Sequence, residues 1–368
     1  MMPQTSLSFG LVALLLTGAP RVADTITKTD GSVLADVKIE SETLKEVTYR
    51  EGRNAQTIPA AEVLSITFSE TPTSVDEALA FLQEGDLGSA VGFLDTYVDA
   101  QIAKPNESKR FGWAPAYAAS KALEIRMQVI DLRGAVSAAK RLIDHYPQSR
   151  YLPTAYLQKA NAEAWMGQND AALATLESMA ELVSSQELSK RWDLECRLAR
   201  IRVDKAKVGA GQRTELAAVG SEAGSAFPTV RGRARVAEGE SYIAEAERTN
   251  DTSKAKDLRG KAQRVFEEIA QDASADAETL AGAYSGLGDC LFFAGAAADD
   301  KNVLKQAAMH YLRVVVNHQE QGQYVPKALF YGMRCFDLMG ERQRRNDLRR
   351  ELLALYPGTT WASRPEVK

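Results

Sequence analysis

The 368-residue chain has few of the residues that build metal sites, disulfide frameworks and large aromatic cores. It contains three cysteines, three histidines and 7% aromatic residues. Cys196, Cys290 and Cys335 are too few and too widely spaced for a disulfide framework, and they fit no metal-ligand spacing. We therefore expect each cysteine to be a small buried residue inside a helix, and we expect no metal and no other cofactor.

Charge of one sign is not in excess either. The formal net charge is -4 at pH 7, whereas proteins that bind nucleic acids or anionic membranes need a basic face. We therefore expect no nucleic-acid partner. The arginine-rich stretch ERQRRNDLRRE at 341–351 contains interspersed acidic residues, which favours ion pairs within one helix. An acidic partner or an anionic headgroup is the alternative for this stretch.

The common catalytic motifs are missing. The chain has no HExxH, no phosphate-binding GxxxxGK[ST] and no GxSxG, the motifs of zinc proteases, nucleotide-binding loops and serine hydrolases. The glycines in YSGLGDCLFF at 284–293 are expected to let helices pack closely rather than to form a phosphate loop. We expect a protein that is not an enzyme, since an enzyme would need a composite site without a recognisable motif.

Long hydrophobic runs are also absent. The apolar stretch at 9–16 is far shorter than the roughly 20 residues that span a bilayer. Such a stretch near the start of a chain is typical of a secretory signal peptide, which would cover residues 1–23. With no cysteine before Cys196, a lipoprotein anchor is not expected. We expect an exported protein of the periplasm or cell envelope of a bacterium.

Between residues 24 and 70, apolar and polar residues alternate with period two. The segments DTITKTDG, SVLADVKIESET, LKEVTYREG, NAQTIP and VLSITFS predict five short strands. Turn residues lie between them at 30–31 and 51–54, and a single 3₁₀ turn is expected at 59–62. Five strands with a short helical turn before the fifth resemble the SH3-like and Sm-like small barrels. The resemblance implies a small β-barrel module at 24–70.

From residue 75 to residue 363 this alternation stops and pairs of helices recur. In AYLQKANAEAWMGQNDAALATLESMA at 155–180, Gly167 separates two helix-forming runs and Ala172 follows five residues later. Gly85 and Ala90 repeat this spacing. Sliding the pattern along the chain aligns seven positions: 90, 135, 172, 216, 262, 307 and 345. The copy centred on 216, within 188–228, is the weakest, and the arginine at 345 leaves the register of the last copy open.

This spacing resembles the tetratricopeptide (TPR) repeat, in which small residues let two antiparallel helices approach and larger residues wedge between neighbouring repeats. The intervals between the aligned positions run from 37 to 46 residues, longer than the 34-residue period of the family, so longer helices or connections are needed. We expect a mainly α protein: a TPR-like α-solenoid of about seven helix pairs, preceded by a small five-stranded β barrel. A HEAT-type or other α-solenoid is the structural alternative.

Two segments, HYPQSRYLPTAYLQKANAEAWMGQNDAALATL and ALFYGMRCFDLMGERQRRNDLRRELLALYPGTTWA, resemble the TPR proteins of Gram-negative envelopes. These include the Tol-Pal-associated cell-division coordinator and the TPR subunit of the barrel-assembly machine. The resemblance implies a scaffold that binds an envelope protein or peptide. Peripheral association with membrane proteins is a further option, and the oligomeric state is left open.

TPR arrays bind peptides or helices along the concave face that the first helix of each pair lines. Carried onto this sequence, the resemblance nominates a partner-binding groove of nine residues: Asn161, Trp165, Glu240, Ile243, Asp289, Phe292, Phe293, Phe330 and Arg334. The alternative for Trp165 and Phe292 is that they fill the core between repeats. A different function is also open, in which the β module binds glycan or peptidoglycan and the helical array is a spacer.

Overall fold

The computed structural model describes residues 23–104, 111–204 and 208–367. The segment 1–22, which carries nearly all of the expected signal peptide, lies outside the described residues. The chain divides into two compact units, one with residues 23–42 and 46–71 and the other with residues 43–45 and 72–367. Within the described part of the chain, no helix is both long enough and apolar enough to cross a membrane.

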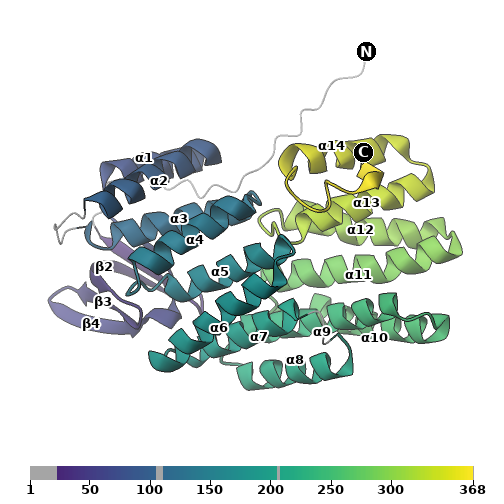
Figure 1. The fold of residues 1–368 in the computed structure, drawn as a ribbon, viewed down its shortest axis with the longest axis horizontal. Helices are drawn as coiled ribbons and strands as arrows, with labels where there is room; N and C mark the ends of the chain where they lie inside the picture. Colours follow the sequence, from purple (N-terminus) through teal and green to yellow (C-terminus); the bar gives the residue numbers. More distant parts are fainter. Residues whose placement is uncertain (1–22, 105–110, 205–207, 368) are drawn as a thin grey trace, which may run out of the picture. The chain divides into compact units, whose positions relative to one another are not determined.

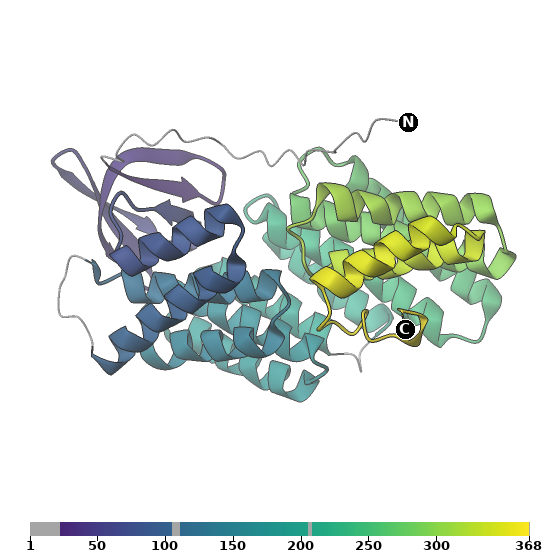
Figure 2. The same cartoon turned by 90° about the horizontal axis from the view of Figure 1, so that it is seen from above.

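The first unit is a five-stranded antiparallel sheet, drawn in purple in Figure 1 and Figure 2. Its strands are β1 (Asp24–Lys28), β2 (Val33–Glu42), β3 (Glu46–Glu51), β4 (Asn54–Pro59) and β5 (Val63–Thr67), with the 3₁₀ turn η1 (Ala60–Glu62) before β5. Ile26, Val47 and Ile66 are buried, as one face of a period-two pattern requires. The five expected strands and the expected 3₁₀ turn are confirmed.

The expected barrel is wrong, because the sheet does not close. The strand order is β4-β3-β2-β1-β5, so β4 and β5 are the two edges. The turn η1 carries the chain from β4 to β5, which pairs with β1 instead. Barrel closure depends on the tilt and stagger of the strands, and the alternation of apolar and polar residues does not specify either of them.

The carboxylate of Asp24 links the first strand of the sheet to the residues that follow the last one. Its Oδ1 accepts hydrogen bonds from the backbone N (2.7 Å) and the Oγ (2.8 Å) of Ser69, and its Oδ2 accepts one from the backbone N of Ile39 (2.8 Å). Asp24 is largely buried, so these three bonds satisfy a carboxylate that burial alone would destabilise.

The second unit contains fourteen α-helices within the described residues, the number that seven pairs require (Figure 1). They are α1 (Thr73–Glu84), α2 (Leu87–Ala103), α3 (Ala114–Gln128), α4 (Leu132–His145), α5 (Leu152–Trp165), α6 (Asn169–Ser185), α7 (Lys190–Val203), α8 (Ala210–Ala223), α9 (Pro228–Arg248), α10 (Thr252–Gln271), α11 (Ala277–Ala298), α12 (Lys301–Asn317), α13 (Val325–Met339) and α14 (Arg342–Leu355). A short 3₁₀ turn, η4 (Pro365–Val367), follows α14.

Helices that follow one another in the sequence pack against each other throughout this unit. The odd-numbered helices from α3 to α13 also contact one another in sequence order, whereas each even-numbered helix packs mainly on its odd-numbered neighbours. The odd-numbered helices therefore form one continuous row, and the face of that row opposite the even-numbered helices is the place where a groove can form.

The small residues that the sequence pattern aligned lie at the interfaces between helices. The residues at 90, 135, 172, 216, 262 and 307 are at most 1% exposed, and each lies on an even-numbered helix. The seventh position differs, because Arg345 is only half-buried and its Nη1 lies 3.6 Å from Oδ1 of Asp337. The buried residues of α14 are instead Leu348 and Leu352, so the register of the last copy is shifted towards them.

Glycines let α9 and α11 approach the ring of Phe266 on α10. A Cβ atom built on Gly239 would lie 3.0 Å from Cε2 of this ring, and one built on Gly286 would lie 2.6 Å from Cε1. Both distances are shorter than the 3.5–4.0 Å at which non-bonded carbon atoms attract each other. Phe266 is fully buried, so its ring occupies the space that the missing side chains leave between α9 and α11.

Candidate partner-binding groove

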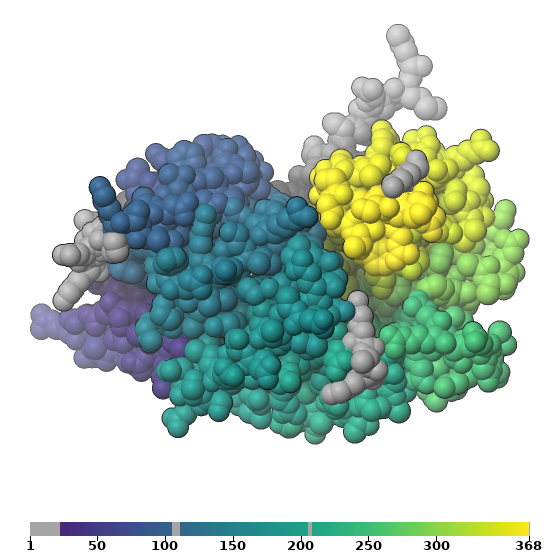
Figure 3. All heavy atoms as spheres, in the orientation of Figure 1, coloured from purple at the N-terminus to yellow at the C-terminus, as the bar shows by residue number. Residues whose placement is uncertain are grey.

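A cavity of about 750 Å³ runs along the row of odd-numbered helices. Figure 3 shows neighbouring helices of this unit lying close together over the face in view, and the cavity is lined by side chains from several helices. We call it the inner groove. The side chains that line it include Leu123, Met127, Gln128, Gln158, Asn161, Trp165, Arg191, Trp192, Glu195, Arg202, Arg233, Glu278 and Gln323.

Segments that are far apart in the sequence meet at the inner groove. The loop at 320–323, between α12 and α13, lines the cavity together with the end of α3. A Cβ atom built on Gly322 would lie 3.1 Å from the backbone oxygen of Gln128 and 3.3 Å from Cδ1 of Ile130. The loop therefore lies directly against the turn between α3 and α4, and a glycine permits that close approach.

One helix supplies both an amide and an aromatic side chain to the inner groove. Asn161 and Trp165 lie four residues apart on α5, are half-buried and both line the cavity. Residues at this spacing share a helix face. From α7, the indole of Trp192 also lines the cavity, although it is 8% exposed and belongs mostly to the core.

A network of ion pairs crosses the inner groove between α7, α9 and α11. Nη1 of Arg233 donates to both carboxylate oxygens of Glu195, at 3.0 and 3.1 Å, and its Nη2 donates to Glu278. Nε2 of Gln323 donates to the other oxygen of Glu278 at 2.7 Å. The buried Nε of Arg233 has no hydrogen-bond partner, so the network leaves one donor unused at the groove.

The charges at the inner groove stabilise one another despite their burial. Burial disfavours the charged guanidinium of Arg233, but Glu195 and Glu278 outweigh this effect and raise its pKa. Arg202 lies 3.5 Å from Glu240, and this carboxylate likewise raises its pKa against the effect of burial. The charges of Arg233 and Arg202 at the inner groove are therefore paired within the protein itself.

Arg191 differs from the other two arginines of the inner groove. Burial lowers the pKa of its guanidinium, and the nearby positive charge of Arg233 lowers it further, while Glu195 opposes the shift. The guanidinium carbon lies 4.9 Å from the ring centroid of Trp192, within range of a cation–π interaction.

The nine residues nominated from the sequence fall into three groups. Asn161 and Trp165 line the inner groove, and Glu240 contacts it through its ion pair with Arg202. Three others are buried in hydrophobic clusters: Ile243, Phe292 and Phe330. For Phe292, this is the core position that the alternative interpretation expected. The role of the first group in binding stays a prediction.

The last group of nominated residues lies around α11 and α13. Asp289 is 4% exposed and accepts hydrogen bonds from Oη of Tyr311 (2.8 Å) and from Nζ of Lys327. Phe293 is partly buried against the hydrophobic clusters, and Nη1 of Arg334 lies 2.6 Å from Oε1 of Glu366. Asp289 and Phe293 lie one turn apart on α11 and Arg334 lies on α13, and none of the three lines the inner groove.

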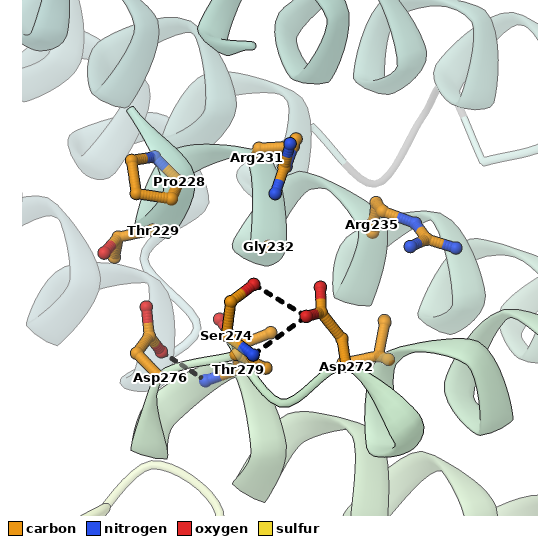
Figure 4. Close-up of a pocket in the computed structure, with 11 residues that line it drawn as sticks. Pro228, Thr229, Arg231, Gly232, Arg235, Asp272, Ser274, Asp276 and Thr279 are labelled. Carbon is orange, nitrogen blue, oxygen red and sulfur yellow. Dashed lines mark hydrogen bonds between the residues drawn. The ribbon is translucent and has the colours of Figure 1, made fainter. Parts of the chain in front are cut away.

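A second cavity, of about 370 Å³, lies between the start of α9 and the turn from α10 to α11 (Figure 4). Its carboxylates are already used by the local backbone. Asp272 accepts from the N and Oγ of Ser274 at 2.9 and 2.6 Å, and Asp276 accepts from the N of Thr279 at 2.8 Å. These bonds shape the turn and cap α11, so both carboxylates of the cavity are already engaged.

Two histidines and the three cysteines, residue types often used in catalysis, are packed against other side chains. His310 and His318 lie with their ring centroids 6.1 and 6.0 Å from that of Tyr284, and burial lowers the pKa of both imidazoles. The three cysteines are free and buried, as expected, and burial raises the pKa of each thiol to about 11 or 12. Within the described ranges, no three His, Cys, Asp or Glu residues are grouped as a metal site would require.

The sequence pattern missed the residues of α7 that line the inner groove. This helix lies in the weakest copy of the repeat, where no aligned glycine marks the first helix. A signal was nevertheless present, because Arg191, Trp192 and Glu195 place a cation, an indole and a carboxylate within one turn of a helix. Trp and Arg are both enriched at protein interfaces.

The inner groove thus combines two indoles, several amides and a paired charge network, which suits non-covalent binding of another chain. It contains no arrangement of nucleophile, base and oxyanion donor among the residues described above. A comparison with protein-family models finds no match for this chain, and a comparison with curated proteins finds none either.

Proposed function

We propose that this protein is a non-catalytic scaffold for protein–protein interaction, and that it binds a segment of a partner protein in the inner groove. In this proposal, α1 to α14 form a TPR-like α-solenoid and the odd-numbered helices are the first helices of its pairs. The observation that carries the proposal is the position of Asn161 and Trp165, which the resemblance to TPR proteins nominated as groove residues and which line the cavity.

The packing of the helices supports the solenoid. Each helix contacts its neighbours in the sequence, and the odd-numbered helices contact one another. This pattern is expected when neighbouring repeats stack on one another. The buried alanines at five of the six aligned positions and the glycines against Phe266 are the small residues that such nesting requires.

The composition of the inner groove supports a peptide segment as the ligand. Trp165 offers a half-buried ring, and aromatic side chains are enriched among the residues that contribute most to binding at interfaces. The amides of Gln158 and Asn161 line the same wall, and amide groups can donate to and accept from the backbone of an extended chain. Arg191 also lines the groove, and a guanidinium on its wall favours acidic over neutral side chains of the partner.

We further propose that the protein works in the bacterial cell envelope. This part rests on the sequence alone, namely on the apolar stretch at 9–16 and on the resemblance to envelope TPR proteins. Sequencing the amino terminus of the protein recovered from its native host tests it: a chain that starts close to residue 24 supports export, and an intact first residue contradicts it.

The groove assignment can be tested with a display library of random twelve-residue peptides. Peptides enriched on the purified protein are synthesised with a fluorescent label, and their binding is measured by anisotropy. We expect Trp165→Ala to weaken binding at least about tenfold, because truncating an aromatic hot spot costs about 2 kcal/mol. We expect Arg191→Gln to weaken acidic peptides more than neutral ones.

Met309→Ala is the matched control, since this exposed apolar residue lies on the even-numbered helix α12. It should leave binding unchanged. Circular dichroism of each variant checks that the helices are intact. If no peptide is enriched, or if the enriched peptides bind the Trp165→Ala and Met309→Ala variants equally well, the inner groove is not the binding site.

A further inference from the structure

The chain after α14 folds back onto α13, as the yellow trace near the label C in Figure 2 shows. We call residues 359–367 the tail. The indole of Trp361 lies with its centroid 5.4 Å from the ring of Phe330 and 5.6 Å from that of Tyr331. Both rings belong to α13, and such distances are typical of favourable aromatic pairs.

Charged contacts extend this docking along the tail. The guanidinium of Arg364 lies 5.5 Å from the centroid of Phe330 and 4.9 Å from that of Trp361. Oε1 of Glu366 lies 2.6 Å from Nη1 of Arg334. Nε of Arg349, on α14, donates to the backbone oxygen of Val367.

The tail buries apolar side chains as well as charges. Ala362 is 6% exposed and Val367 is fully buried, and both belong to the hydrophobic cluster of α11, α12 and α13. Apart from η4 at 365–367, the tail has no regular secondary structure. It is therefore held by side-chain contacts, in the way that a short peptide is held on a folded surface.

These contacts use residues that the repeat pattern nominated for partner binding. Phe330 and Arg334 were both carried over from the groove positions of TPR proteins, and the chain's own tail covers both. We define the tail surface as Phe330, Tyr331 and Arg334 of α13 with Arg349 of α14. None of these four residues is among those that line the inner groove.

We propose that the tail surface is a second peptide-docking surface, and that the tail is its internal ligand. The surface recognises an aromatic residue, a basic residue three positions later and an acidic residue two positions after that, the pattern of Trp361, Arg364 and Glu366. An external partner segment with this pattern binds only by displacing the tail. This proposal does not depend on a ligand in the inner groove.

The tether makes the tail a strong competitor. A segment held by a short connection has an effective concentration of roughly 1 mM. A free peptide that binds the open surface with a dissociation constant of about 10–100 μM would therefore bind the full chain about ten to a hundred times more weakly. Loosening the tail is then enough to expose the surface.

The test uses a labelled synthetic peptide of residues 357–368 and two forms of the protein, the full chain and a chain that ends at Gly358. Fluorescence anisotropy measures binding of the peptide to each form. We expect saturable binding to the shortened chain and at least tenfold weaker binding to the full chain. In the peptide, Trp361→Ala should weaken binding at least about tenfold, whereas Thr360→Ala, at an exposed position, should not.

A second variant covers the case in which the shortened chain does not fold. The full chain with Trp361→Ala and Glu366→Lys keeps the length of the tail but loses two of its contacts, and it should bind the wild-type peptide. The proposal is overturned if folded protein of either kind does not bind the peptide, or binds a scrambled peptide equally well.

Discussion

Replacing Gly286 with alanine should destabilise the helical unit, because the new methyl group would overlap sterically with the ring of Phe266. The Cβ atom would lie 2.6 Å from Cε1 of that ring, about 1 Å short of ordinary carbon contact. Gly239 approaches the same fully buried ring, with its own Cβ position 3.0 Å from Cε2. The ring therefore has little room to move away.

The magnitude follows from two opposing effects. Overpacking of a core typically costs about 1–3 kcal/mol, and the restricted ring places Gly286→Ala near 3 kcal/mol. Alanine gains about 1 kcal/mol of helix propensity over glycine, which leaves a net loss of about 2 kcal/mol. Gly260→Ala on α10 is the control, because nothing lies within 4 Å of its Cβ position, and it should stabilise the protein by up to about 1 kcal/mol.

Urea unfolding followed by far-ultraviolet circular dichroism measures both free energies. A Phe266→Leu substitution in the Gly286→Ala background should recover at least about 1 kcal/mol relative to the sum of the single effects, since the smaller side chain makes room for the methyl group. If Gly286→Ala is as stable as Gly260→Ala, the nesting of α11 on Phe266 is wrong, and with it the main support for the solenoid.

Two further substitutions test the charged contacts. Lys327→Met removes the cation that faces the buried Asp289, and we expect it to lower the free energy of unfolding by about 3 kcal/mol. This value is near the low end for a broken buried pair, because the lysine side chain is 22% exposed. Asp289→Asn in the same chain should recover part of the loss. Hydrogen bonds from Arg197 and Lys190 lower the pKa of Glu222 from 4.5 to about 2, so this carboxylate contributes stability above pH 4.5 that is lost as the pH falls towards 2. Glu222→Gln should therefore lose less stability than wild type between pH 6 and pH 3 in urea titrations, and equal losses would contradict the assigned pairing.

The positions of the helix pairs could be predicted because the spacing of small residues reflects a direct physical requirement. A large side chain at Ala172 or Ala262 would keep two helices apart, so such positions are visible in the sequence. Gly85, Gly167 and Gly340 mark helix ends for a different physical reason. Each adopts a φ of +80° just after a helix, a conformation that favours glycine. The strands of the first unit were also predictable, because successive side chains of a strand point to opposite faces of the sheet and one face is buried.

The candidate site was only partly predictable. Repeat spacing identifies which helix face looks inward, but it does not distinguish a groove residue such as Trp165 from a core residue such as Phe292. That distinction depends on whether a neighbouring helix or the tail covers the side chain, which is a matter of long-range packing. The same limit explains why the ion pairs of Arg233 with α7 and α11 were not foreseen, since they join residues 38 and 45 positions apart.

The glycines of α11 have a consequence for how the array holds together. This helix of 22 residues carries four buried glycines, at 282, 286, 288 and 295, and each lowers the intrinsic helix stability by about 1 kcal/mol relative to alanine. Alone in water, the segment would be mostly coil, because short helices depend on packing for their stability. It becomes helical only against its neighbours. Folding of α11 therefore depends on its contacts with α9, α10, α12 and α13.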